Sequence, residues 1–567
     1  MTTAQQMLAG LSEDELEALA HQLQTKVTVE LVNTIITPVR YGPVWQREGD
    51  GWHLPEKTLG WQIAGWAAEW LRGEDGKPWR FTMEQLRFIL WWYAVDHNGR
   101  FIYRKGVLQR MKGWGKDPLL AVMCLVELCG PSRFSHWDAA GDPVGIAHPQ
   151  ALVQVSAVNQ SQTSNTMMLI PSLMSDAFKA KYDITEGAVL IRAMGGRVRL
   201  EAATSSFRAL EGKRTTFTLM NETHHWVKGN NGHKMYETID GNATKKDSRY
   251  LAITNAYLPG EDSVAERMRD AYAKILEGKV KDIGFLYDSL EAHPKAPLTG
   301  PLLPLVLDRV RGDAVWLVID TIIQSISDTT IAQSRSRRMW LNQIVAEEEA
   351  LHGPETWDVL LDENAMLMPG DEITLGFDGG KTDDATALVA LRIKDLLAVP
   401  LIIEEKPDGP EGEGWEVNRD KVDDAVHHAF RTYKVKAFYA DVALWESYIG
   451  EWNGFYAEGL GVKASERSPI GWDMRASLQR STRAHERFMQ GIWDGKLKHD
   501  GDLTLRRHVL NARRATNNWG VSFRKESRES PRKVDAYAAL MLAYEAMSDY
   551  RVRGKKVKER SGRGYFL

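Results

Sequence analysis

Three aspartates at the ends of apolar segments are the residues whose spacing points most clearly to chemistry. Asp378 ends the apolar run that begins at Ile373, Asp441 ends the run from Lys436, and Asp535 opens an apolar helix. Three carboxylates can hold two divalent cations roughly 3.5–4 Å apart, one activating water and one stabilising the leaving oxygen. A single aspartate in such a place is more often a cap or a surface acid, but three in this order predict metal-dependent phosphodiester cleavage.

A second kind of chemistry is indicated by the stretch Val107–Asp117, which reads VLQRMKGWGKD. An apolar strand, a turn through Gly113 and Gly115, a lysine at 116 and a helix after it are the layout of a P-loop. Backbone N–H groups of such a loop wrap phosphates, and Lys112 and Lys116 add positive charge. By itself the stretch is also compatible with an ordinary glycine-containing turn.

Three further segments supply residues that a nucleotide site needs. The apolar strand before Asn221 and Glu222 ends in a polar pair, and Glu222 is the candidate that orients or deprotonates the attacking water. Asn255 follows the predicted strand Tyr250–Thr254 and is placed to sense the γ-phosphate of ATP. Gln85 begins a helix upstream of the P-loop, where its amide can both donate to and accept from adenine.

Two positions depart from the usual pattern of a Mg²⁺-ATP site. Asp117 stands where a Ser or Thr hydroxyl is usual, and Asn221 stands where an acid is usual. Both side chains remain oxygen donors, which Mg²⁺ prefers. We therefore expect the carboxylate at the metal to have moved from the strand end to the loop, with ATPase activity retained.

Composition and charge limit the remaining possibilities. The net charge of −4 excludes a generally basic nucleic-acid coat but permits local basic channels. Cys124 and Cys129 match no metal motif and are interpreted as buried thiols in a reducing compartment. No apolar run approaches membrane-spanning length, and no signal peptide is recognised. The tail Arg551–Leu567 carries seven basic residues and one acid, and we expect it to be disordered alone and suited to DNA phosphates.

The order of these segments predicts an α/β protein in which a P-loop (ASCE-type) ATPase domain precedes a ribonuclease H-like nuclease domain. A helix is also expected from Ser12 to Gln24, because Ser12 and Glu15 form a capping box. The predicted parts are a helical, Trp-rich extension (1–80), the ATPase motor (81–350), a linker (351–370), the nuclease (371–550) and the basic tail (551–567).

Taken together, the motifs resemble those of the large terminase subunits of tailed bacteriophages, from about Phe81 to Ala546. The resemblance rests on the regions of Gln85, Lys112–Lys116, Met220–Trp226 and Ile253–Asn255, and on Arg337–Gln343, Asp378, Asp441 and Asp535. It implies a protein that uses ATP and Mg²⁺, with Mn²⁺ possible in the nuclease site. It implies translocation of double-stranded DNA through a portal protein into a procapsid, and cutting of concatemeric genomes.

The resemblance also implies partners and a place of action. Such proteins work as a homo-oligomeric ring, commonly a pentamer, with a small terminase subunit that chooses the site, in the host cytoplasm and not in the mature virion. The arginine that completes the charge of the site is not evident: Arg208, Arg214, Arg110 and Lys112 are candidates. Two alternatives remain, a DNA-cutting or assembly component with an inactive ATPase and a helicase-like repair enzyme fused to a nuclease.

Overall fold

The computed structural model divides the chain into two compact units, residues 1–258 with 262–345 and residues 259–261 with 346–567. It describes residues 3–9, 11–12, 16, 19–20, 26–204, 210, 212–245, 248–328, 330–346, 350–381, 384–407, 412, 414–465, 467–525 and 532–560. No helix of the described residues is both long and apolar enough to cross a membrane.

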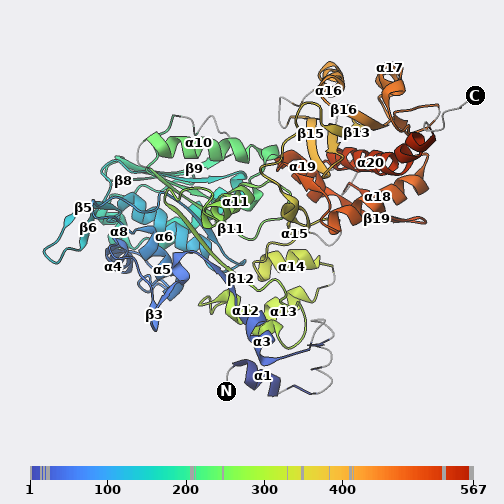
Figure 1. Ribbon diagram of the computed structural model, residues 1–567. Coiled ribbons are helices and arrows are strands. Elements are labelled where there is room, and N and C mark those ends of the chain that lie inside the picture. The colour runs from blue at the N-terminus through green and yellow to red at the C-terminus, as the bar shows by residue number, and fades with distance from the viewer. Residues whose placement is uncertain are drawn as a thin grey trace, which may run out of the picture. The chain divides into compact units, whose positions relative to one another are not determined.

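An eight-stranded sheet is the framework of the first unit (Figure 1). Its order is β1 (Val39–Tyr41), β12 (Phe285–Glu291), β4 (Lys105–Gln109), β11 (Arg249–Thr254), β10 (Phe217–Met220), β7 (Leu152–Ala157), β9 (Val198–Thr204) and β8 (Leu190–Ala193). The six inner strands are parallel and only the outer strands β1 and β8 run antiparallel to their neighbours. One strand, β11, therefore stands between the P-loop strand β4 and the strand β10 that leads to Glu222, as in an ASCE-type ATPase.

Helices cover both faces of this sheet, because successive residues of a strand point to opposite sides. Leu108 packs with the helices of one face and Val107 with those of the other. The first face carries α4 (Gly60–Trp70), α5 (Met83–Trp92), α6 (Lys116–Cys129), α7 (Gln160–Leu173) and α8 (Asp176–Lys181), and the second carries α10 (Gly232–Lys245) and α11 (Val264–Leu276).

The remaining elements of the first unit are short. They are α1 (Thr3–Ala9), α3 (Val29–Ile36), α12 (Leu303–Arg311), α13 (Ile319–Ile326), α14 (Gln333–Trp340), and the hairpins β2 (Arg47–Glu48) with β3 (Gly51–Trp52) and β5 (Arg133–Trp137) with β6 (Pro143–Ile146).

A six-stranded mixed sheet forms the second unit. Its order is β17 (Gly471–Trp472), β16 (Lys434–Asp441), β13 (Glu372–Gly379), β14 (Thr386–Arg392), β15 (Leu397–Glu404) and β18 (Lys498–His499). Strands β13, β14 and β15 form an antiparallel meander, and β16 joins β13 in parallel. This is the ribonuclease H-like arrangement that the sequence predicts.

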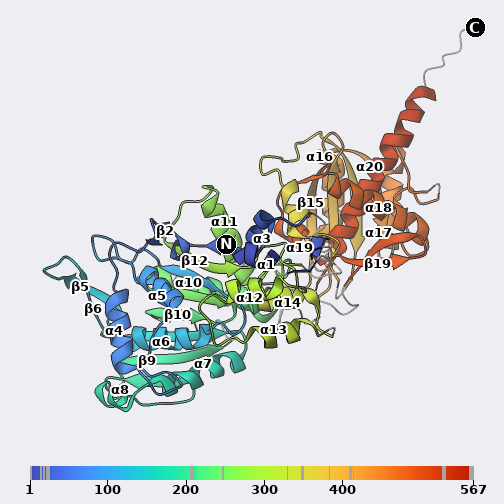
Figure 2. The same cartoon turned by 90° about the horizontal axis from the view of Figure 1, so that it is seen from below.

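Helices again cover both faces of the second sheet (Figure 2). One core includes residues of α18 (Leu478–Trp493), α19 (Leu503–Asn511) and α20 (Asp535–Arg560), and the other includes residues of α16 (Arg419–Thr432) and α17 (Glu446–Tyr456). The short helix α15 (Pro354–Trp357) and the hairpin of β19 (Arg513–Asn517) with β20 (Gly520–Arg524) complete the unit. Trp357 of α15 is buried in the first of these cores.

One local expectation was wrong, one lies largely outside the described residues, and one strand was not expected. Helix α20 continues to Arg560, so the first part of the basic tail is helical and the prediction that all of it is disordered was wrong. The helix expected over Ser12–Gln24 falls largely outside the described residues. Strand β12 was not anticipated, because its sequence FLYDSLE carries three polar side chains and does not read as an apolar run.

Candidate active sites

The P-loop residues adopt the conformation that their glycines allow. Gly113 and Gly115 have φ of +79° and +90°, a region that L side chains rarely adopt, and Gly115 caps helix α6. The helix begins at Lys116, so its first N–H groups and its dipole face the loop. Strand β4, the glycine turn and α6 thus form the anion-binding geometry that the sequence predicts.

Lys116 is buried and folded back onto its own loop. Its Nζ donates to the carbonyl oxygens of Arg110 and Met111, both at 3.0 Å, and to Oδ1 of Asn255 at 2.6 Å. Burial lowers the pKa of Lys116 to about 8, although the carboxylates of Asp117 and Glu222 act in the opposite direction. A buried ammonium held only by neutral oxygens is a group that an anion would stabilise.

Asn255, the residue predicted to sense the γ-phosphate, lies against Lys116. It follows β11, the strand between the P-loop strand and the strand of Glu222, and its side chain is buried. The neighbouring Thr254 hydroxyl is hydrogen-bonded to Nδ1 of His224 at 3.1 Å. The tips of β10 and β11 are thus tied together beside the lysine.

Glu222 occupies a strained backbone position at the tip of β10. Its φ of +51° and ψ of 55° are left-handed, which is uncommon for a residue other than glycine, asparagine or aspartate. Its Oε2 accepts a hydrogen bond from Nε2 of Gln162 at 2.6 Å, and its side chain is partly exposed. Its carboxylate influences the pKa values of both Lys116 and Asp117, so the structure brings the three charged groups into one site.

The two unusual positions, Asp117 and Asn221, do not contact each other in the described residues. Asp117 is in the first turn of α6 and is exposed as a residue. Desolvation of its carboxyl group by the surrounding protein raises its pKa, the charge of Lys116 lowers it, and the charge of Glu222 raises it. The amide of Asn221 donates to the carbonyl oxygen of Gln162 and to Oγ1 of Thr166, both on α7. Its Oδ1 is buried without a hydrogen-bond partner, which leaves one oxygen for a ligand.

Gln85 lies against the P-loop, together with a tryptophan that sequence reasoning missed. A Cβ at Gly115 would lie 3.7 Å from Nε2 of Gln85 and 2.9 Å from the ring of Trp316. Trp316 also donates from Nε1 to the carbonyl oxygen of Gly113 at 2.9 Å. Oε1 of Gln85 accepts from the backbone N–H of Thr82 in a capping box, so only its donor side faces the loop.

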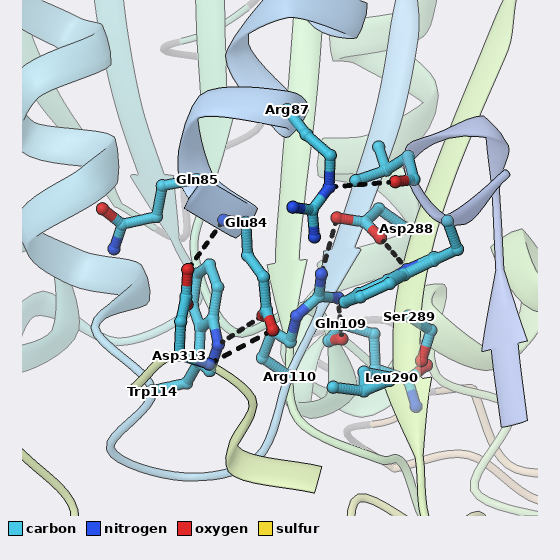
Figure 3. A network of polar contacts seen from close by, with 12 residues as sticks. Glu84, Gln85, Arg87, Gln109, Arg110, Trp114, Asp288, Ser289, Leu290 and Asp313 are labelled. Carbon is cyan, nitrogen blue, oxygen red and sulfur yellow. Dashed lines mark hydrogen bonds and ion pairs between the residues drawn. The ribbon is translucent and has the colours of Figure 1, made fainter. Parts of the chain in front are cut away.

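Arg110 is not available as the charge-completing arginine, contrary to one of our expectations. Its guanidinium is fully buried and pairs with Asp288 of β12 at 2.7 Å, between the rings of Trp45 and Trp114 (Figure 3). A buried ion pair of this kind is costly to break from one side. Lys112 remains exposed, and its backbone N–H donates to the carbonyl oxygen of Met339 in α14.

The two other arginine candidates are not placed at the site. Arg214 is exposed. Arg208 lies outside the described residues. The residue that completes the charge of the nucleotide site therefore stays unassigned.

The three predicted nuclease aspartates lie at one end of the second sheet. Phe377 pairs with Ala440 in the parallel ladder of β13 and β16, so Asp378 and Asp441 follow at the same level on adjacent strands. Helix α20 crosses β13 so closely that a Cβ at Gly376 would lie 1.9 Å from the carbonyl oxygen of Ala539. That approach places the first residue of α20, Asp535, over the strand ends.

The charges of these carboxylates act on one another. Burial raises the pKa of Asp378 well above its usual range, and the charges of Asp535 and Asp441 raise it further. Burial also raises the pKa of Asp441, and Oδ2 of Asp535 is buried without a hydrogen-bond partner. Crowded carboxylates with an orphaned oxygen fit the chemistry of Mg²⁺ or Mn²⁺. Within the described part of the chain, no three His, Cys, Asp or Glu side chains are already grouped closely enough to hold a metal.

Lysine side chains near the aspartates were not anticipated. Lys525, directly after β20, forms an ion pair with Asp384, and Lys533 approaches the same carboxylate at 3.6 Å. Burial lowers the pKa of Lys525, while the charges of Asp535 and Asp378 raise it. No local pattern predicted this arrangement, because Lys525 and Asp384 are far apart in sequence.

The start of α20 is fixed by buried polar contacts. The backbone N–H of Ala536 donates to Nδ1 of His508 at 2.9 Å, and Nε2 of His508 pairs with Oε1 of Glu405 at 2.9 Å. Although burial alone would raise the pKa of Glu405, its bonds to His508 and Arg507 lower it to about 2. Because Ala536 directly follows Asp535, these contacts also fix the position of Asp535.

Known proteins resemble the chain to different degrees. No family model matches the chain. Among solved structures, it is similar to the large terminase of bacteriophage HK97, at 14% identity over 86% of this chain and 100% of that chain with a TM-score of 0.48. It is also similar to the large terminase of a thermophilic bacteriophage, at 9% identity over 83% and 99% of the two chains with a TM-score of 0.33.

Curated relatives give the family. The chain is 41% identical to the Gene 13 protein of Mycobacterium phage L5 over 92% of this chain and 96% of that protein. It is 40% identical to the Gene 13 protein of Mycobacterium phage D29 over the same shares. The chain belongs to this family of Gene 13 proteins of mycobacteriophages.

Proposed function

We propose that this chain is the large subunit of a phage DNA-packaging terminase. Residues 81–350 hydrolyse ATP to move double-stranded DNA through a portal into a procapsid, and residues 371–550 cut concatemeric DNA. The observation that carries the proposal is the 2.6 Å contact of Lys116 with Asn255, at the tip of the strand between the P-loop and Glu222 strands. It joins the phosphate-binding loop to the strand that would respond when the γ-phosphate leaves.

In the ATPase, the loop and Lys116 bind the phosphates of ATP. The ammonium exchanges the carbonyl oxygens of Arg110 and Met111 for phosphate oxygens, and negative charge raises its pKa again. Glu222, held by Gln162, orients the attacking water. Mg²⁺, when bound, would neutralise phosphate charge, with Asp117 and Oδ1 of Asn221 as the oxygens that would hold it.

In the nuclease, Asp378, Asp441 and Asp535 would hold the metal ions. The support is their place at one sheet end, the raised pKa of Asp378 and the orphaned oxygen of Asp535. Bound Mg²⁺ or Mn²⁺ would supply an activated water and would stabilise the leaving oxygen. A solved large terminase nuclease, that of the thermophilic phage G20c, has bound magnesium.

The partners we propose follow from the same function. They are double-stranded DNA, a portal protein on a procapsid and a small terminase subunit, with the chain itself in a homo-oligomeric ring of five. The place of action is the host cytoplasm, with transient docking on procapsids and absence from the mature virion. That both curated relatives are phage proteins supports this assignment.

The test is ATP turnover measured with and without portal-bearing procapsids of the same phage. We expect turnover to rise when procapsids and duplex DNA are both present. Equal turnover with procapsids that lack the portal would contradict packaging, because the stimulus must come from the ring on which the motor docks.

A second candidate function is a DNA-cutting or assembly component whose ATPase is inactive. The observation that favours it is the side chain of Asn221, whose amide binds α7 instead of the P-loop side of the site. This candidate predicts plasmid cleavage with no ATP turnover under any of the conditions above. The retained Lys116 and Glu222, and the electrostatic interaction between them, favour the active motor.

A further inference from the structure

A recess in the first unit combines arginines with tryptophans beside the P-loop. It has a volume of about 310 Å³ and lies next to the β2–β3 hairpin, the start of α5 and the end of α12. Its lining includes four arginines, two tryptophans and three acids: Arg40, Arg47, Arg87, Arg309, Trp45, Trp52, Glu84, Asp308 and Asp313. None of these residues is used by the nucleotide site described above.

The ring of Trp52 contacts two of the arginines. The guanidinium carbons of Arg47 and Arg87 lie 3.6 Å and 3.8 Å from the centre of the Trp52 ring. Two groups this close to one ring centre must lie on opposite faces. A stacked guanidinium keeps its N–H edge free to bind in the ring plane, with less conformational entropy to lose.

The acids around the recess accept hydrogen bonds or an ion pair from groups other than the four arginines, and one oxygen, Oδ1 of Asp313, is buried without a partner in the described part of the chain. Oε2 of Glu84 accepts from Nε1 of Trp114, and Oε1 accepts from the backbone N–H of Asp313 (Figure 3). Oδ2 of Asp313 accepts from the backbone N–H of Glu84, and Asp308 pairs with Arg311. Asp288, deeper in the unit, pairs with Arg110.

The four arginines lack such neutralisation. Among the described residues, none of them makes an ion pair; Arg87 donates to the carbonyl oxygen of Val44, and Arg47 to that of Asp50. Burial lowers the pKa of Arg40, and repulsion from Arg47 and Arg309 lowers it further, while the charge of Glu84 acts in the opposite direction. The four arginines outnumber the three acids of the lining, each of which already accepts a hydrogen bond or an ion pair from another group, so an anion would complete the charge of the recess.

We propose that this recess, formed by Arg40, Arg47, Arg87 and Arg309 around Trp52, binds a phosphate group of the duplex DNA backbone. Guanidinium groups match phosphate oxygens in pairs, which favours phosphate over a simple halide. Arg40, Arg47 and Arg309 are exposed, so a backbone outside the protein can reach them. Only the choice of DNA as the source of the phosphate rests on the proposed function.

The recess shares a wall with the P-loop. Glu84, which lines it, binds Trp114 between Gly113 and Gly115, and Gln85 is the next residue of α5. A phosphate in the recess would change the electrostatic environment of Glu84 directly. The site is thus placed to report bound DNA to the loop.

The test uses the full chain with Lys116→Ala, so that phosphate at the P-loop does not contribute. In that background, Arg40→Gln with Arg309→Gln is compared with Arg100→Gln with Lys281→Gln, an exposed pair outside the recess with the same change of charge. These substitutions leave the stacked pair on Trp52 in place. Melting temperature is measured with inorganic phosphate or chloride at equal ionic strength, and affinity for a short duplex is measured at several salt concentrations.

We expect phosphate to raise the melting temperature of the parent and of the control pair, but not of the recess variant. Duplex affinity of the recess variant should fall several-fold, with a salt slope less steep by about 1 for each DNA phosphate that is no longer bound. An equal phosphate shift in both variants would overturn the site. Absence of the phosphate shift together with unchanged duplex binding would overturn DNA as the ligand, and neither outcome depends on ATP hydrolysis.

Discussion

The two candidate active sites of this protein bury charges of opposite sign. In the first unit, the Lys116 ammonium is buried among carbonyl oxygens and Asn255, and burial lowers its pKa to about 8. In the second, the Asp378 carboxylate is buried near Asp441 and Asp535, and its pKa is raised well above the usual range. The first site is suited to gain an anion and the second to gain cations.

This contrast shows how the same architecture serves two chemistries. Both sites lie where parallel strands end and a helix begins, β4 with α6 and β13 with α20. In the ATPase unit, the helix begins with a lysine, whereas in the nuclease unit it begins with an aspartate. The proposed phosphate site and the proposed metal site therefore differ in the charge at the helix start.

Removing one of the crowded carboxylates should have the greatest effect. Asp378→Ala, Asp441→Ala and Asp535→Ala should each reduce metal-dependent cleavage of plasmid DNA to background, because the missing carboxylate unseats a metal. Asp424→Ala, an exposed acid on α16, is the matched control and should cleave normally. Cleavage persisting in the Asp378→Ala protein would show that these aspartates are not the nuclease site.

The ATPase unit should respond differently to the loss of its cation and of its acid. Lys116→Ala removes a phosphate ligand and should weaken binding of a fluorescent ADP analogue. Glu222→Gln should leave that binding largely intact and lower turnover by ~10²–10⁴-fold, since it removes the group that orients the water. Parental turnover by both variants would show that the loop is not a nucleotide site.

Asp117 and Asn221 are an exception to the contrast between the two sites, because Asp117 adds a carboxylate to the P-loop. If they share one Mg²⁺, Asp117→Ser should lose activity, Asn221→Asp should alter the metal requirement, and the double variant should recover toward the parent. A double-mutant cycle on ATP turnover should give a coupling energy of about 0.5–3 kcal/mol. Strictly additive losses of ATP turnover would show that the two side chains do not share a metal ion.

The raised pKa of Glu84 in the ATPase unit should have a smaller effect than the changes above, and it should affect stability alone. Burial raises the pKa of Glu84 to about 7, with Arg110 opposing and Asp313 adding to the rise. The folded state then binds this proton more tightly than the unfolded chain does, so the stability from it is full below the unfolded pKa of about 4.5 and is lost as pH rises to about 7.

Melting of the first unit between about pH 5 and pH 8 measures this linkage. The loss of melting temperature with rising pH should be smaller in Glu84→Gln than in the parent. The exposed Glu30→Gln serves as the control and should follow the parent. A Glu84→Gln profile as steep as that of the parent would contradict the raised pKa.

Much of the fold follows from local sequence signals. The runs before Asp378 and Asp441 and the glycine turn before Lys116 are apolar and end in polar residues, so their strands and helices were predicted close to their observed bounds. Asn255 was predicted beside the phosphates and lies against Lys116. Order along the chain sufficed because consecutive parallel strands end at one edge of a sheet.

Other features depend on contacts between distant segments and could not be predicted in this way. Strand β12 was missed because Asp288 interrupts its apolar pattern, yet that aspartate is buried by pairing with Arg110. The same pair withdraws Arg110 from the surface, where the sequence had left it as a candidate. Trp316 reaches the P-loop from about two hundred residues away, and no local pattern marks such a contact.

The two sites of opposite charge should act independently within one chain. ATP hydrolysis and plasmid cleavage, assayed on the same preparation of the parent, Glu222→Gln and Asp378→Ala proteins, measure this independence. We predict both activities in the parent, cleavage without hydrolysis in Glu222→Gln, and hydrolysis without cleavage in Asp378→Ala. Loss of both activities in either variant, with melting unchanged, would contradict the independence of the two sites.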